Sequence, residues 1–161
     1  MNSTTLDNLI PLEVQEVVED KQTDTQIVVL RHRDGAEILP IWVGNAEGIA
    51  IRLSLAGIAP PRPMSHDLMR NFAEHFNVKV ERVVVTSVKQ NTYYSQIHLS
   101  NRGTDQILDA RPSDAIALAM RTHSPMFVTR EVLAERGATS WESWQQRLPP
   151  QTSDDAKQEQ G

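Results

Sequence analysis

A short apolar segment that follows a strand-like segment occurs twice in this chain, and this repeat limits the possible folds more than any other feature. EGIAI at positions 47–51 matches DAIAL at 114–118, an offset of 67 residues (114 − 47). The strand-like segments before them also correspond, 38–39 against 107–108. We therefore predict two copies of a unit with three strands and helices, which favours one sheet with helices packed against it.

The hydrophobic pattern predicts the elements of each copy. The predicted strands are residues 12–18, 25–31, 37–43, 78–88, 92–99 and 105–111. The predicted helices are residues 46–56, 65–76, 113–121, 129–137 and 140–148, with a short apolar segment at 126–128. We place one α+β domain at 9–149, with repeats at about 10–77 and 78–137, and a disordered polar tail at 150–161.

Composition narrows the functional classes. The 161 residues contain no cysteine, which excludes disulfides, thiolate zinc sites and cysteine nucleophiles and is compatible with a cytoplasmic protein. No apolar run approaches the roughly 20 residues of a membrane span, so we expect no membrane association. The net charge is -5, whereas proteins that bind nucleic acid over a broad face are usually basic. Any contact with nucleic acid must therefore be local.

Three motifs carry a resemblance to a known family. They are LPIWVGNAE at 39–47, RPMSHDL at 62–68 and DARPSDAIALA at 109–119. In this order the chain resembles the bifunctional nuclease domain family. The resemblance implies a duplicated β3-α2 unit that forms one strongly curved, barrel-like mixed sheet with helices packed on it. It also implies a homo-oligomer and nuclease activity on DNA and RNA.

Two carboxylates occupy equivalent places in the two copies. Glu47 and Asp114 each lie in the first turn of a predicted helix, where a carboxylate complements the helix dipole. They could also converge across the two copies to hold a divalent cation. Mg²⁺ and Mn²⁺ prefer such oxygen ligands, and metal clamps are common in phosphodiester cleavage.

A second candidate group precedes the helix at 113–121. Strand alternation places Asp109 and Arg111 on the same face, either as a structural ion pair or as functional residues. In the functional interpretation Arg111 binds phosphate, and Asp109 is a metal ligand or a base. Ser113 is the predicted N-cap, and the free N–H groups beside it would help to bind substrate.

The start of the helix at 65–76 supplies the third group. Ser65 is its predicted N-cap, Asp67 would complement the dipole, and His66 could simply be exposed. Alternatively His66 and Asp67 are catalytic, with His66 as general acid or base. Arg62, fixed between two prolines, is either a phosphate ligand or half of a salt bridge.

Two functions follow from these candidates. The first is a nuclease that hydrolyses DNA or RNA, assisted by a divalent metal, and it depends on the family resemblance. The second is a non-catalytic module that binds an anionic small molecule or a protein in the same cleft. The acidic net charge favours the second, as does the absence of a familiar nuclease metal motif.

Overall fold

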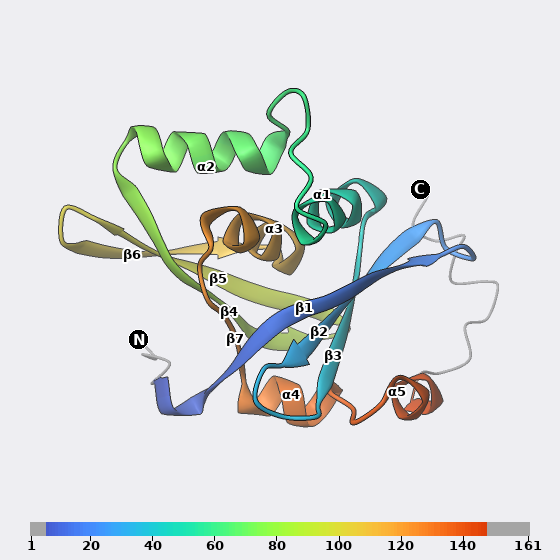
Figure 1. Cartoon of the computed structure of the whole chain (residues 1–161). Coiled ribbons are helices and arrows are strands. Elements are labelled where there is room, and N and C mark those ends of the chain that lie inside the picture. The colour runs from blue at the N-terminus through green and yellow to red at the C-terminus, as the bar shows by residue number, and fades with distance from the viewer. Residues whose placement is uncertain (1–5, 148–161) are drawn as a thin grey trace.

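Seven β-strands and five α-helices make up residues 6–147, the part of the chain that the computed structural model describes (Figure 1). The strands are β1 (Leu9–Asp20), β2 (Thr25–His32), β3 (Ile38–Val43), β4 (Val78–Lys89), β5 (Thr92–Asn101), β6 (Thr104–Ala110) and β7 (Met126–Thr129). The helices are α1 (Asn45–Leu55), α2 (Ser65–His75), α3 (Pro112–Thr122), α4 (Arg130–Arg136) and α5 (Trp141–Arg147), with a 3-10 turn, η1 (Leu6–Asn8), before β1. The predicted α+β class is confirmed.

All seven strands form one mixed sheet in the order β3-β2-β1-β7-β4-β5-β6. Each half of the chain supplies an antiparallel meander, β1–β2–β3 and then β4–β5–β6. Strand β7 lies between the two meanders, antiparallel to β1 and parallel to β4. This strand of four residues therefore joins the two halves into one sheet and makes the sheet mixed.

The sheet is not closed, and the strongly curved, barrel-like form that the family resemblance implied is not confirmed. Strands β3 and β6 lie at opposite ends of the strand order and do not pair with each other. Closure into a barrel would require that pairing, which removes both edges. Both halves show a meander followed by a helix, whereas their origin from one duplicated unit stays a prediction.

The main core lies between the sheet and helices α1, α3 and α4. Val28 of β2, Ile51 of α1 and Ile116 of α3 are among its buried members. The opposite face of β2 packs against Trp42 and Trp141. Strand β2 is thus buried on both faces, which explains its continuous apolar run at residues 27–30.

The tryptophans of α5 belong to the packing of the domain. Trp144 is buried, and its ring lies 5.0 Å from that of Trp42 and 4.9 Å from that of Trp141. Trp144 is therefore not available as a contact between subunits. The predicted end of the domain near residue 149 and the tail at 150–161 lie outside the described residues.

The N-cap residues of the helices that carry the candidate residues differ from the predicted caps Ser65 and Ser113. Their N-cap residues are Gly44, Met64 and Arg111. Ser65 and Ser113 therefore lie inside the first turns and do not cap. In α2 the capping acceptor is the carboxylate of Asp67, which accepts the N–H of Met64 at 2.9 Å.

Helices α1, α2 and α3 lie above the strands in the view of Figure 1, and α4 and α5 lie below them. Within residues 6–147, none of the helices has the length and apolar character that crossing a bilayer requires.

Candidate functional site

Four side chains form a continuous chain of hydrogen bonds where α1, α2 and α3 begin. Nε2–H of His66 donates to Oδ1 of Asp114 at 2.9 Å. The other carboxylate oxygen of Asp114 accepts Nε–H of Arg111 at 3.0 Å. Arg111 also donates from Nη2 to Oε1 of Glu47 at 3.3 Å. We refer to Glu47, His66, Arg111 and Asp114 as the helix-start cluster.

The two carboxylates of the cluster occupy positions that suit a helix start. Glu47 and Asp114 lie in the first turns of α1 and α3, where a negative charge interacts favourably with the free N–H groups. Arg111 immediately precedes α3, whose first residue is Pro112, a residue favoured at that position because it needs no hydrogen-bond acceptor. Glu47 and Asp114 thus converge across the two halves of the chain on the Arg111 guanidinium, whereas their role as shared metal ligands stays a prediction.

Gly44 makes room for the Glu47 side chain. A Cβ atom at position 44 would collide with Oε2 of Glu47. The glycine therefore allows this carboxylate to fold back over the start of α1. Any larger residue at position 44 would push Glu47 away from the helix start.

The electrostatics of the cluster keep Asp114 ionised. Partial burial raises the pKa of Asp114, but hydrogen bonds from His66 and Arg111, and their charges, outweigh burial and lower this pKa below its ordinary 3.8. The same hydrogen bond and charge of Asp114 raise the pKa of Arg111. The Arg111 side chain is 67% exposed, so it can turn from the carboxylates to a ligand at little energetic cost.

His66 is held at one ring nitrogen only. Its side chain is 7% exposed, and Nε2 is fixed by Asp114. Nδ1 has no hydrogen-bond partner among residues 6–147. A histidine that a carboxylate orients at one nitrogen can exchange a proton at the other, which is the arrangement of a general acid or base.

Asp67 holds helices together, unlike its neighbour His66. Its Oδ1 accepts Nε–H of Arg121 at 2.8 Å, and its Oδ2 caps α2. Arg121 also donates to the carbonyl oxygens of Ala117 and Ala50, each at 3.0 Å, so it ties α1, α2 and α3 together. Both oxygens of Asp67 are therefore engaged in holding the helices.

Asp109 lies apart from the helix-start cluster. It is exposed on β6 opposite Gln96, and its carboxylate has no hydrogen bond or ion pair with any described residue. Its neighbour Leu108 points toward α2, so alternation along the strand directs Asp109 to the other face of the sheet. The predicted common face of Asp109 and Arg111 fails because β6 ends at Ala110, before Arg111.

Arg62 and Ser113 lie next to the cluster in sequence but do not join its hydrogen bonds. Arg62 is exposed in the loop between α1 and α2 and has no ion pair within residues 6–147. Ser113 is buried in the first turn of α3, and its hydroxyl has no hydrogen-bond partner in the described part of the chain. The guanidinium of Arg62 is thus available to an anion.

The cluster as it stands does not suit a resident divalent ion. Glu47 and Asp114 both bind the guanidinium of Arg111, so a metal shared by the two carboxylates would have to displace it. Residues 6–147 contain no group of three or more His, Cys, Asp or Glu side chains arranged to hold a metal. Assistance by Mg²⁺ or Mn²⁺ therefore stays a prediction, and we derive no chemical step from it.

Comparisons with known proteins give a matching family model and several relatives. The family model described as the bifunctional nuclease domain matches residues 28–140, a range that contains all four cluster residues. The uncharacterized protein Rv1829 of Mycobacterium tuberculosis is 35% identical over 111 residues, which cover 69% of this chain and 66% of that protein.

Two plant proteins are also similar. Bifunctional nuclease 1 of Oryza sativa subsp. japonica is 32% identical over 114 residues, covering 68% of this chain and 34% of the rice protein. Bifunctional nuclease 1 of Arabidopsis thaliana is 28% identical over 131 residues, covering 79% of this chain and 40% of that protein. The chain therefore spans less than two thirds of the length of each of these relatives.

Proposed function

The chain belongs to the bifunctional nuclease domain family, and from this premise we propose that it hydrolyses phosphodiester bonds of DNA or RNA at the helix-start cluster. The names of the plant relatives support a nuclease. The location of the proposed active site is supported by the hydrogen bonds that link His66 through Asp114 to the exposed Arg111. It joins a proton-transfer group, the carboxylate that orients it and a phosphate-binding cation.

The proposed reaction assigns one role to each side chain. Arg111 turns from Glu47 and Asp114 to bind the non-bridging oxygens of a phosphate. Nδ1 of His66 accepts a proton from the attacking water, while Asp114 holds Nε2–H and stabilises the imidazolium. The water oxygen bonds to phosphorus as the bond to the leaving oxygen breaks, and the proton passes to the leaving oxygen. Arg62 would contact a neighbouring phosphate.

The deciding experiment compares two aspartates of the same sequence motif. Purified native chain, Asp114→Asn and Asp109→Asn are assayed on labelled DNA and RNA, each with and without EDTA. We expect Asp114→Asn to lower the initial rate about a hundredfold or more, because general acid–base catalysis contributes roughly 10²–10⁴-fold. Asp109→Asn, on the other face of the sheet, should retain the native rate.

Two results would contradict the proposed site, and a third would show that His66 does not activate the water without a metal. Native rates in both variants would show that the helix-start cluster does not take part in catalysis. Loss of activity only in Asp109→Asn would move the site to the other face of the sheet. Loss of activity of the native chain in EDTA would support the predicted divalent metal and require its ligands to be found.

A binding module is the second candidate, and a specific observation favours it. Arg111 is already paired with two carboxylates, and the chain carries a net charge of -5, so an anion must compete with Glu47 and Asp114. This arrangement is compatible with reversible recognition of an anion without cleavage. Binding of oligonucleotide without any cleavage by rigorously purified chain would favour this function over the nuclease.

We also predict that the chain forms homo-oligomers and that it is located in the cytoplasm. Sedimentation at micromolar concentration tests the first, and a species of 18.1 kDa, the mass of one chain, would contradict it. Cell fractionation of the tagged chain tests the second.

A further inference from the structure

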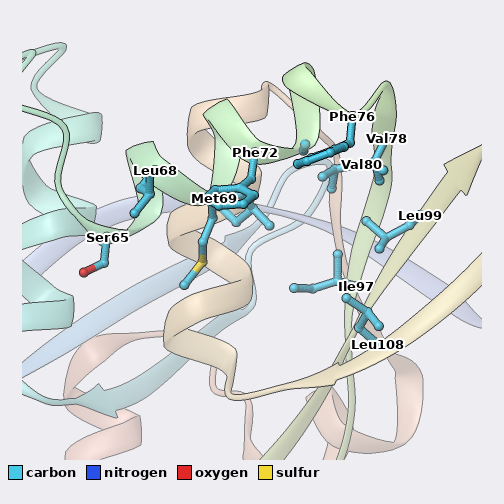
Figure 2. A pocket seen from close by; sticks show the side chains of 12 residues that line it. Ser65, Leu68, Met69, Phe72, Phe76, Val78, Val80, Ile97, Leu99 and Leu108 are labelled. Carbon is cyan, nitrogen blue, oxygen red and sulfur yellow. The ribbon is translucent and has the colours of Figure 1, made fainter.

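An apolar groove lies between α2 and the second half of the sheet. It has a volume of about 570 Å³, within the range of about 300–1,000 Å³ that is typical of ligand sites. Val80 of β4 and Ile97 and Leu99 of β5 line its strand side. Figure 2 shows Met69 and Phe72 on the side of α2 that looks toward Ile97. We call this surface the α2 groove.

The helical side of the α2 groove exposes two phenylalanines. Phe72 is 58% exposed and Phe76 is 62% exposed, although residues of this type are normally buried. Their rings are stacked on one another with centroids 6.0 Å apart. Exposed apolar side chains gathered in this way mark a binding surface.

The α2 groove is continuous with the helix-start cluster. Ser65 lines one end of the groove and immediately precedes His66. Leu118 also lines the groove and lies one turn after Asp114 on the same side of α3. From Ser65 to Phe76 the groove follows α2 for about 16 Å, since each residue of a helix adds about 1.5 Å. A chain bound at the cluster can therefore continue into the groove.

Exposed arginines lie near both ends of the groove, where carboxylates are present as well. Arg111 and Arg62 belong to the end beside His66. At the other end, Val78 lines the groove and pairs with Asn101, so the turn residue Arg102 lies there as well. Arg62 and Arg102 are exposed and have no ion pair among residues 6–147. Each end of the groove therefore offers an exposed arginine that can contact the phosphates of a bound strand.

We propose that the α2 groove binds unpaired nucleobases, which stack on Phe72 and Phe76, and that the substrate is therefore single-stranded nucleic acid. This inference rests on the proposed nuclease function, because it places the scissile phosphate at the cluster. Aromatic platforms between cations are the usual means of binding single strands. Duplexes hide the faces of their bases and are bound mainly through extended basic surfaces, which a chain of net charge -5 lacks.

The test measures binding separately from cleavage. Fluorescence anisotropy follows a labelled single-stranded DNA of about 12 nucleotides, an abasic strand of the same length and the corresponding duplex. The proteins are the native chain, the double variant Phe72→Ala/Phe76→Ala and the control Tyr94→Ala, which removes an exposed aromatic ring outside the groove. Each probe is checked on a gel after titration, and Asp114→Asn replaces the native background if the probe is cut.

We expect the native chain to bind the single strand at least tenfold more tightly than the abasic strand or the duplex. The double variant should lose about tenfold or more in affinity for the single strand, since each stacked base contributes substantially to binding. Tyr94→Ala should bind as the native chain does. Melting temperatures of all variants should match the native value, because the replaced rings are exposed.

Equal affinity for the normal and abasic strands would overturn the inference, as would unchanged binding by the double variant. A native dimer that the double variant converts to monomers without loss of binding would assign the groove to a second copy and overturn it too. Binding that depends on the bases but is not followed by cleavage would contradict the nuclease function and support base binding in the α2 groove. Equal cleavage of single strands and duplexes, unchanged in the Phe72→Ala/Phe76→Ala variant, would support the nuclease function and overturn the proposed role of the α2 groove.

Discussion

Two aspartate–arginine pairs lie within the same three-helix layer, and their surroundings differ sharply. Arg121 and Asp67 are 4% and 10% exposed, and Arg121 also binds two backbone carbonyls. Arg111 and Asp114 are 67% and 26% exposed, and they share their contacts with His66 and Glu47. The chemical groups are the same, so only burial and neighbouring partners distinguish the two pairs.

The difference separates a structural role from a functional one. Every polar group of the Asp67–Arg121 pair is directed at another part of the protein, which leaves nothing for a ligand. The Asp114–Arg111 pair keeps an exposed guanidinium at the surface. It lies beside His66, whose Nδ1 has no hydrogen-bond partner among residues 6–147. We therefore expect the first pair to determine stability and the second to determine activity.

The largest effect on stability is expected for Arg121→Met. Removing one member of a buried ion pair leaves the Asp67 charge without compensation, which costs about 3–5 kcal/mol of unfolding free energy. Urea denaturation followed by circular dichroism measures this loss. A loss below about 1 kcal/mol would show that the buried pair is not the structural tie that the geometry indicates.

The double variant Asp67→Asn/Arg121→Met provides the matched control. Asparagine keeps an acceptor for the N–H of Met64 but removes the unpaired charge. The double variant should therefore be more stable than Arg121→Met alone. If the second substitution simply adds to the loss, the penalty does not come from a buried charge.

Lowering the pH should reduce the contribution of both pairs to the free energy of unfolding, and that of the buried pair more. Burial raises the pKa of Asp67, but the N–H of Met64 and the guanidinium of Arg121 outweigh burial and lower this pKa below 3.8. Asp114 has a lowered pKa as well. Their stabilisation is fully present above the unfolded-state pKa near 3.8 and is lost as the pH falls through the lower folded-state values. Stability measured from pH 6 down to about pH 2 should fall less in Asp67→Asn than in Asp114→Asn, relative to the native chain. The opposite order would contradict the comparison.

The smallest effect is expected for Glu47→Gln. This substitution removes one partner of the exposed Arg111, and exposed ion pairs contribute only about 0.2–1 kcal/mol. Differential scanning calorimetry should show a melting temperature close to the native value. A loss as large as that of Arg121→Met would mean that the helix-start cluster is itself structural.

Local patterns in the sequence were sufficient for much of the site. The equivalent helix starts of Glu47 and Asp114 suggested, as one of two alternatives, that they converge on a divalent cation. The structure brings both carboxylates to the guanidinium of Arg111. The approximate bounds of strands β1 to β6 also followed from the hydrophobic pattern. These features depend on neighbours in sequence, which propensity and periodicity describe well.

Contacts between distant segments could not be predicted in this way. Strand β7 has four residues, too few to carry a pattern that identifies it as the link between the two halves. Arg121 was missed because charged residues are rarely buried, and only its three partners from α1, α2 and α3 explain its position. Asp109 was grouped with Arg111 because strand alternation was extended one residue past the end of β6.

The most direct test of the account measures stability and specific activity on the same two preparations, Arg111→Ala and Arg121→Met. Initial rates of oligonucleotide cleavage are divided by the folded fraction, which circular dichroism gives at the assay temperature. We predict that Arg111→Ala melts close to the native temperature but loses at least tenfold in rate per folded molecule. Arg121→Met should melt far lower and keep the native rate per folded molecule. If Arg111→Ala retains the native rate, or if both variants lose stability and activity in parallel, the separation of a structural pair from a functional pair is wrong.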